Sequence, residues 1–526
     1  MLLQNRIVLP VIFSTLALLA GCGNSVNNAT PPPSGGFSAS SLKGTYVFST
    51  SGSDSSANGF PIQLTGAFTS SGSGSISGGA FSIASGSLGT ASNQAITGGS
   101  YTVTSDGRGQ VTLQNSSGLG PISLDFVLSS SSGGLVTEFD NNGSGSGTLD
   151  AQGTVAQSDI NGQSFAFLLS GEGSVGLFLT AGAFTLDSNG AVSTGLQDIT
   201  TYNFNTGAST AQNATINTSS TVAIGTGTAP GSAQFSNSVG GIASGDVYAI
   251  SKDHLKFIET DGLQLITGDV FTQQSSLPTG NLAFTMSGAD TTVAPLAIGG
   301  LLSTSGATIT AGVEDYNDAG STGTASTISG GFSALSNGRA ILTLNGIENG
   351  GNSLALGNYT FAAYPSTGGT ILLEVDGAGA SSGSVLVQSS TSFSASAGYA
   401  VNLSAVNTSS EEDDIAEFTA TSSSFSGLID VNDEGTLNPD QRLSGNYQTV
   451  SSGPAGRYSL TSNAFNGNFY TVDGSTVLFL EMDNDQVGTA IFETQSAPSS
   501  SANLARAAVL HPNFHLGRGA NKLRRK

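Results

Sequence analysis

A short acidic segment, Glu-x-Asp at the end of an apolar run, occurs four times in this 526-residue chain. The four glutamates are Glu138, Glu259, Glu374 and Glu481, and the aspartates that follow them are Asp140, Asp261, Asp376 and Asp483. Fourteen residues after each glutamate stands a glutamine, at Gln152, Gln273, Gln388 and Gln495. Successive copies are 121, 115 and 107 residues apart. Because one internal offset is kept in every copy, the pattern predicts four tandem repeats, each forming one structural unit.

Short apolar segments and turn-forming residues alternate throughout these repeats. Glycine accounts for 73 residues, 37% of the chain is hydrophobic and only 10% is charged. Such a pattern predicts short strands joined by tight turns. The first repeat divides into strands at 44–51, 60–69, 75–83, 95–105, 109–115, 122–129, 134–140 and 147–152.

We therefore expect an all-β fold with four tandem repeats of about 107–121 residues. Each repeat is predicted to be an antiparallel meander of about eight short strands that closes into a small β-barrel, because closure removes exposed strand edges. A two-sheet β-sandwich is the main alternative, and a continuous β-solenoid is a second one.

The repeats are expected at residues 42–157, 158–276, 277–390 and 391–495. A second motif lies in the middle of three of them, at Ile96–Val103, Ile328–Phe332 and Leu443–Tyr447. The second repeat lacks a clear copy, and Ser219–Ile224 stands in its place.

The first 21 residues read as an export signal, with Arg6 before an apolar run of 13 residues from Ile7 to Leu19. The run ends in Leu19-Ala20-Gly21-Cys22, which resembles the lipobox of bacterial lipoproteins. The resemblance implies cleavage before Cys22 and attachment of palmitate-like acyl chains there, which would anchor the protein to a membrane. Gly23 follows the cysteine, as in lipoproteins sent to the outer membrane of envelopes that have two membranes. The body resembles repetitive β-rich cell-envelope lipoproteins that are themselves uncharacterised.

The segments that flank the repeats differ from them in composition. Residues 22–41, which follow the signal and include three consecutive prolines, are expected to be the lipidated cysteine and a flexible tether. Residues 496–526 are basic and are expected to form a disordered tail. The formal net charge of −22 argues against nucleic acid as a partner.

The repeated carboxylates admit a catalytic and an architectural interpretation. Residues at positions i and i+2 share one face of a strand about 6–7 Å apart, and paired carboxylates serve glycoside hydrolysis. However, each aspartate stands where a turn begins, and an enzyme rarely needs four identical sites. The architectural role is favoured, and an extracellular glycoside hydrolase is the alternative.

The repeated glutamates have apolar neighbours, and a buried carboxylate needs a partner or a shifted pKa. Because arginines are scarce, the sequence predicts the ion pairs Glu138–Arg108, Glu374–Arg339 and Glu481–Arg457. Lys252 or Lys256 is the expected partner of Glu259.

Two oxygen-rich turns partly resemble calcium loops, and they make Asp315, Asn317, Asp430 and Asn432 weak metal candidates. Asp198 and Ser82 fill the equivalent slot in the second and first repeats. The twelfth position is Ser326 in one loop and Gln441 in the other, where a bidentate glutamate is wanted, so turn hydrogen bonding is favoured. No metal or other cofactor is expected.

These observations predict a non-enzymatic, lipid-anchored cell-envelope protein that works through surface interaction or ligand binding. The expected partners are the membrane, through its anchor, and a glycan, a small apolar ligand or another protein. A transmembrane barrel is disfavoured because the predicted strands are short for a span.

Overall fold

The computed structural model describes residues 36–56, 59–240, 242–348, 356–407 and 410–496. The described chain consists mainly of 34 strands, which form four antiparallel sheets that we call modules 1 to 4. The all-β prediction is confirmed. Neither short helix in the described ranges is long or apolar enough to cross a membrane.

Modules 1 and 4 are closed eight-stranded barrels in which consecutive strands pair and the last strand returns to the first. Module 1 follows a short 3-10 helix (Ala39–Ser41) and contains β1 (Lys43–Asp54), β2 (Pro61–Ser71), β3 (Ser75–Ser85), β4 (Gly89–Val103), β5 (Arg108–Asn115), β6 (Ile122–Ser130), β7 (Gly133–Asp140) and β8 (Gly143–Ala151). Module 4 contains β27 (Gly398–Asn407), β28 (Glu411–Ala420), β29 (Ser424–Asp433), β30 (Thr436–Thr449), β31 (Arg457–Ser462), β32 (Asn466–Thr471), β33 (Thr476–Glu481) and β34 (Gln486–Thr494).

Module 3 is also closed, although one of its long strands is divided in two. It contains β18 (Asn281–Ala289), β19 (Pro295–Ser305), β20 (Thr308–Asp318), β21 (Ser321–Ala325), β22 (Ser329–Phe332), β23 (Ala340–Glu348), β24 (Leu356–Ser366), β25 (Gly369–Glu374) and β26 (Ala380–Val387). Strand β20 pairs with β19, β21 and β22, and this pairing completes the barrel.

Module 2 departs from the predicted closed barrel. It contains α1 (Gln157–Ile160), β9 (Ser164–Gly173), β10 (Gly176–Leu186), β11 (Val192–Asn203), β12 (Ala208–Thr215), β13 (Thr221–Ala223), β14 (Gly231–Ser236), β15 (Ile242–Ser251), β16 (His254–Glu259) and β17 (Leu265–Thr272). Its nine strands form an open sheet with β12 and β13 at the edges. Isolated bridges, Ala191 to Thr221 and Ile216 to Asn237, take the place of a continuous ladder. The barrel is therefore incomplete in the repeat that lacks the middle motif.

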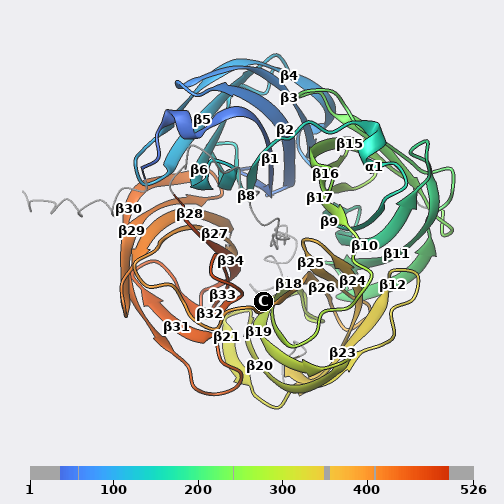
Figure 1. Cartoon of the computed structure of the whole chain (residues 1–526), viewed down its shortest axis with the longest axis vertical. Coiled ribbons are helices and arrows are strands. Elements are labelled where there is room, and N and C mark those ends of the chain that lie inside the picture. Colours follow the sequence, from blue (N-terminus) through green and yellow to red (C-terminus); the bar gives the residue numbers. More distant parts are fainter. Residues whose placement is uncertain (1–35, 57–58, 241, 349–355, 408–409, 497–526) are drawn as a thin grey trace, which may run out of the picture.

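The four modules form a closed ring, which Figure 1 shows along its axis. Module 1 contacts module 2 through β2 and β17, module 2 contacts module 3 through β10 and β25, and module 3 contacts module 4 through β19 and β33. Strands β28 and β8 bring module 4 against module 1, so the last repeat meets the first. The first and last strands of each module lie on the inner side of the ring (Figure 1).

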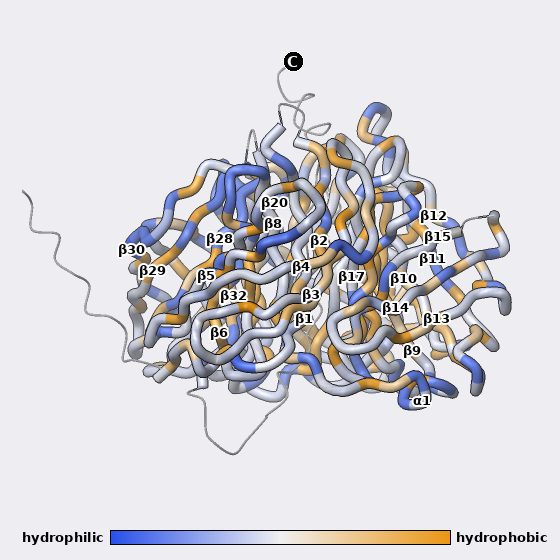
Figure 2. The backbone as a smooth tube through the Cα atoms, turned by 90° about the horizontal axis from the view of Figure 1, so that it is seen from above, coloured by the Kyte–Doolittle hydropathy of each residue, from blue (hydrophilic) through white to orange (hydrophobic). Residues whose placement is uncertain are grey.

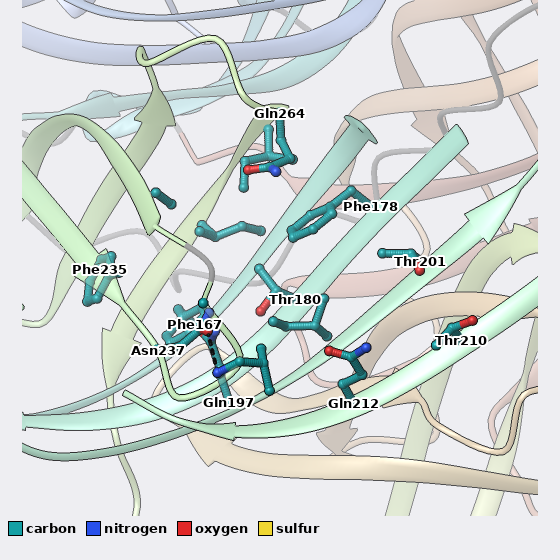
Figure 3. Close-up of a pocket in the computed structure, with 16 residues that line it drawn as sticks. Phe167, Phe178, Thr180, Gln197, Thr201, Thr210, Gln212, Phe235, Asn237 and Gln264 are labelled. Carbon is teal, nitrogen blue, oxygen red and sulfur yellow. Dashed lines mark hydrogen bonds between the residues drawn. The ribbon is translucent and has the colours of Figure 1, made fainter. Parts of the chain in front are cut away.

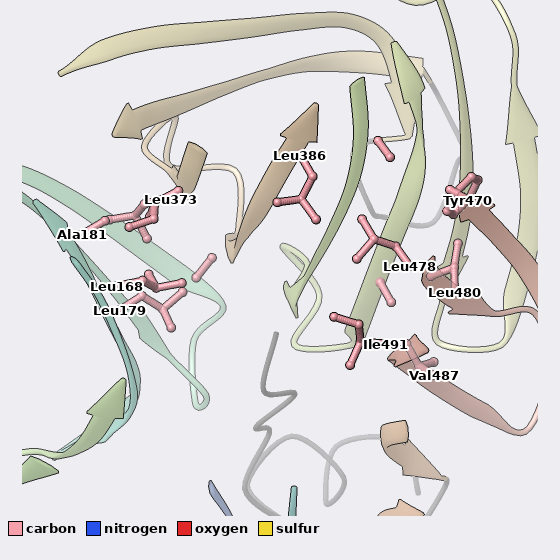
Figure 4. Packing of buried hydrophobic residues seen from close by; sticks show 14 of the residues in the cluster. Leu168, Leu179, Ala181, Leu373, Leu386, Tyr470, Leu478, Leu480, Val487 and Ile491 are labelled. Carbon is pink, nitrogen blue, oxygen red and sulfur yellow. The ribbon is translucent and has the colours of Figure 1, made fainter. Parts of the chain in front are cut away.

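Strand alternation divides the hydrophobic residues between two kinds of core, and Figure 2 shows hydrophobic and hydrophilic residues interspersed along the chain. Inward-facing residues such as Val136 fill their own barrel, whereas outward-facing residues such as Leu135 join a cluster shared by all four modules. Figure 4 shows part of this cluster, with Ala181 of module 2 beside Leu373 of module 3.

The strands of modules 1 to 4 lie within the four ranges expected for the repeats. The two alternative folds, a two-sheet sandwich and a continuous solenoid, are wrong.

Candidate functional site

The aspartate of each repeat binds the backbone of a turn, as the architectural interpretation expects. Asp140 accepts hydrogen bonds from the backbone N–H groups of Ser123 (3.2 Å) and Asn142 (2.8 Å). Asp376 accepts from the N–H groups of Thr360 (2.7 Å) and Ala378 (2.9 Å). Asp261 binds the equivalent two N–H groups in module 2, and Asp483 accepts from the N–H of Asn466 at the start of β32 in module 4. These carboxylates hold the turn after the acidic strand against the start of the preceding strand.

The glutamate of each repeat points into its barrel and is fully buried, with at most 3% of any of the four exposed. Burial and the charge of the nearby aspartate raise the pKa of Glu138, Glu374 and Glu481 well above the usual value. Burial also raises the pKa of Glu259 to about 9. The Glu374 carboxyl accepts a hydrogen bond from the Ser381 hydroxyl (2.7 Å). Each of these shifts favours the neutral, protonated form of the carboxyl group.

The predicted ion pairs between arginines and these glutamates are wrong. Arg108 instead binds Asp430 (2.6 Å), Arg339 binds Asp198 (2.5 Å), and Arg457 binds Asp315 (2.7 Å from Nε). In each case the aspartate belongs to the preceding module of the ring. The physical reason is strand alternation: the arginines point out of their barrels, whereas Glu138, Glu374 and Glu481 point inward.

Two of these interfaces add a tyrosine to the pair. The Tyr364 hydroxyl donates to Asp198 (2.5 Å), and the Tyr470 hydroxyl donates to Asp315 (2.6 Å). The interface between modules 1 and 2 lacks the aspartate–arginine pair, because Ser82 occupies the aspartate slot and module 2 contains no arginine. There the Ser82 hydroxyl bonds Tyr248 (2.9 Å). Ser82 and Ser92 also donate to the carboxylate of Asp246 in module 2 (2.5 and 2.7 Å), so the acid at this interface comes from the following module.

The lysines expected near Glu259 have other partners. Lys256 binds Asp269 (2.6 Å), which also contacts Nε2 of His254 (2.7 Å). Burial alone would raise the pKa of Asp269, but the charges of Lys256 and His254 hold it below the usual value. Lys252 binds its exposed neighbour Asp253 (2.7 Å). The prediction of a lysine partner for Glu259 is therefore wrong.

The weak calcium candidates are engaged in contacts between modules. Asp315 and Asp430 bind arginines, as described above. The Asn317 amide donates to the carbonyl groups of Glu481 (3.0 Å) and Gln486 (2.7 Å), and the Asn432 amide donates to that of Glu138 (2.7 Å). No group of three or more His, Cys, Asp or Glu side chains within the described ranges is arranged to hold a metal ion.

The repeated glutamines, to which the sequence assigned no role, join each module to the next. Gln152 of module 1 donates to the carbonyl of Ala249 in module 2 (2.9 Å), and Gln388 of module 3 donates to that of Thr471 in module 4 (2.8 Å). Gln273 makes the same link from module 2 to module 3, through the carbonyl of Gly338 (3.2 Å). Gln495 closes the ring by donating to the carbonyl of Leu128 in module 1 (3.0 Å).

A cavity of about 290 Å³ occupies the interior of module 2 (Figure 3). Its floor consists of apolar side chains on β9, β10, β11 and β17, and its polar edge includes Gln197, Gln212 and Thr201. The lining residues Thr210 and Gln212 on β12 and Val239 in the turn after β14 are exposed. The mouth of the cavity therefore lies between β12 and that turn, at the incomplete side of the barrel.

The ring, the aspartate–arginine–tyrosine contacts and this cavity were not predicted from the sequence. The sequence did contain one signal for the contacts. Equivalent positions of repeats 2, 3 and 4 hold the aspartates Asp198, Asp315 and Asp430, and their arginine partners stand one repeat further on, in repeats 3, 4 and 1. This offset by one repeat matches pairing between neighbours in a closed ring. For the cavity, the signal was the middle motif absent from repeat 2.

Comparison with known proteins gives little further information. No protein family and no curated protein matches the chain. Three solved structures show weak similarity: CghA with Sch210972 (9% identity, 66% of this chain and 95% of that one, TM-score 0.17), kievitone hydratase from Nectria haematococca (11%, 66% and 96%, 0.15) and intact Ap-TbpB with its N and C lobes (9%, 69% and 83%, 0.14). Similarities this weak carry no argument about function.

The expected export signal, Cys22, most of the tether and nearly all of the basic tail lie outside the described residues.

Proposed function

We propose that this chain is a lipid-anchored cell-envelope protein that acts by binding and not by catalysis. Acyl chains on Cys22 would hold it to the membrane, the outer one where the cell has two, and residues up to 41 would connect the anchor to the ring. The ring would act as a rigid platform. A small ligand, a glycan or a protein is the expected partner in addition to the membrane.

One observation carries this proposal: the repeated polar residues are engaged in holding the structure together. The aspartates bind backbone N–H groups, the glutamates are buried inside their barrels, and the glutamines join neighbouring modules. Residues used in this way in every copy are not available as a nucleophile or a general base. What distinguishes one module from the others is the cavity of module 2.

The alternative, a glycoside hydrolase, requires one repeat with an open cleft that holds two close carboxylates. Module 2 is the open repeat, but the described residues that line its cavity include no aspartate or glutamate. The cavity therefore favours binding over hydrolysis.

The anchor is tested by growing a bacterial host with labelled palmitate. We expect the full-length chain to incorporate the label and to fractionate with the outer membrane, and the Cys22→Ser variant to do neither. The Cys22→Ser variant should still yield the folded ring, since every strand in the described part of the chain lies between Lys43 and Thr494. Label retained in the variant, or a wild-type chain without label, would refute the lipid anchor.

The absence of catalysis is tested with the same protein and a panel of oligosaccharides. We expect any oligosaccharide that raises the melting temperature to be recovered intact after prolonged incubation. A ligand at 100 times its dissociation constant stabilises the folded state by about 2.7 kcal/mol, which a thermal-shift assay detects. Release of shorter sugars, lost when Glu259 is replaced by Gln, would support the hydrolase instead.

A further inference from the structure

The cavity of module 2 combines an apolar floor with an uncharged polar edge, and none of the repeated contacts uses it. We infer that it binds a small uncharged molecule with one apolar face and one edge that carries hydroxyl, carbonyl or amide groups. This inference rests on the proposed binding function and names the ligand class of one site. The cavity volume of about 290 Å³ lies near the lower end of the usual range for small-molecule sites.

The floor of the cavity is built before any ligand arrives. Phe167, Leu169 and Ile266 are buried core residues of the module whose side chains reach the cavity. The ring of Phe235 stacks on that of Phe167, with centroids 6.0 Å apart and planes 25° from parallel. A flat apolar group placed here would meet aromatic and aliphatic surface held by the barrel, so little ordering is needed on binding.

The polar edge determines that the ligand is uncharged. Gln197, Gln212 and Thr201 offer amide and hydroxyl groups that both donate and accept hydrogen bonds. The described lining contains no charged side chain. An ionised ligand would lose its hydration without gaining an opposite charge, whereas a neutral polar group would exchange water for these partners.

Exposed apolar residues gather at the same end of the module. Of the large hydrophobic residues in the described ranges, Val239 is 50% exposed, Leu263 59% and Val175 48%. Val239 lines the cavity, and Leu263 directly precedes the lining residue Gln264. Val175 lies in the turn between β9 and β10. Because Glu172 pairs with Leu265, this turn lies beside the turn after β16 that contains Leu263. Apolar side chains around an opening assist entry of an amphipathic molecule.

Comparison with module 3 shows how the same position is filled when the barrel is closed. Ile199 follows Asp198 in module 2, and Tyr316 follows Asp315 in module 3. Across the sheet, Ile199 pairs with Gln212 and Tyr316 pairs with Gly323. Tyr316 belongs to the core of module 3, and a side chain at Gly323 would collide with its hydroxyl. In module 2 the smaller Ile199 leaves room for a ligand.

The inference is tested with the double variant Ile199→Tyr with Gln212→Gly, which places the tyrosine and glycine of module 3 at the matching positions of module 2. The chain from Gly23 onward retains every described residue and avoids detergent. It is titrated with N-phenyl-1-naphthylamine, an uncharged dye whose fluorescence rises in apolar sites. We expect saturable binding of one dye per wild-type chain and binding weaker by about tenfold or more in the double variant. The matched control, Gln234→Gly on β14, changes an exposed residue that does not line the cavity and should bind like wild type.

A second variant and a second dye keep the result decisive. Thr210→Trp places a large side chain at the mouth of the cavity. Because Thr210 is exposed on β12, this variant should fold normally. It should lose dye binding, and this result can be read even if the double variant is less stable than wild type. The anionic analogue 8-anilinonaphthalene-1-sulfonate should bind about tenfold more weakly than the neutral dye. Equal binding to wild type and both variants, no binding to wild type, or preference for the anionic dye would overturn the inference. None of these outcomes depends on lipid attachment, so a failed palmitate experiment and a failed cavity are distinguishable.

Discussion

At the residue scale, the most unusual feature is a buried carboxyl group in every barrel. Glu138, Glu259, Glu374 and Glu481 lie inside the sheets, and neither side-chain oxygen of Glu481 meets a hydrogen-bond donor among the described residues. Burial disfavours the charged form, so each pKa rises. In the unfolded chain the same groups ionise near the ordinary value for glutamate, so at Glu259, whose pKa rises to about 9, folding takes up a proton at neutral pH.

This linkage gives the sign of a pH effect. A group whose pKa is higher in the folded state stabilises the fold below its unfolded pKa and loses that contribution as the pH rises toward the folded value. For Glu259 the window runs from 4.5 to about 9. Each such group lowers the free energy of unfolding by about 1.4 kcal/mol per pH unit within its window. We expect Glu259→Gln, which keeps the shape without the ionisation, to raise the melting temperature at pH 8 and to make its pH dependence shallower.

Thermal melts between pH 5 and pH 9 check this prediction, with the exposed Asp485→Asn as the control that should follow wild type. A Glu259→Gln protein that is less stable than wild type at pH 8, or equally dependent on pH, would mean that the carboxyl is ionised in the fold.

At the element scale, the end of each last strand connects two modules. The backbone N–H of Ser389, directly after Gln388, donates to the carbonyl of Val472 in module 4 (2.7 Å). The same bond joins Gly153 to Ile250 and Ser496 to Ser129. Side chain and backbone therefore act together, and the fixed spacing from glutamate to glutamine follows from one strand-and-turn geometry repeated in four modules.

Replacing Gln388 by Leu removes one of these links. We expect the free energy of unfolding to fall by about 0.5–1.5 kcal/mol, the usual net value of a hydrogen bond. Hydrogen exchange should accelerate in the peptide that contains Ser389 and stay unchanged in the peptide that contains Gly153. Gln441→Leu, an exposed residue whose amide bonds only the nearby carbonyl of Pro439 (2.9 Å), is the matched control. Faster exchange at both interfaces would show that the link has no local role.

At the scale of the whole molecule, the ring explains why four copies are present and why their interfaces are alike. Each module presents an acidic residue to the next module and a glutamine that reaches its backbone, except where Ser82 replaces the aspartate. Because module 4 meets module 1 through the same contacts, no interface is left exposed at the ends of the array.

Much of this architecture could be predicted from the sequence, but its closure could not. The repeat of Glu138, Asp140 and Gln152 gave the number of modules, and turn residues gave the short strands. Pairing of Arg108 with Asp430 could not be derived, because the two residues are 322 positions apart and their contact depends on how outward faces of different barrels meet. The cavity escaped prediction for a related reason: whether Ile199 fills the interior depends on the residue across the sheet.

The closed ring is tested most directly by a double-mutant cycle across the interface of modules 4 and 1. We would unfold wild type, Arg108→Met, Asp430→Asn and the double variant with urea. This pair is suited to the measurement because both side chains are mostly buried, with 13% and 7% exposed. A closed ring predicts a coupling free energy of about 1–3 kcal/mol between residues of the first and last modules. Effects that add to within about 0.3 kcal/mol would mean that modules 1 and 4 do not touch, and would contradict the ring.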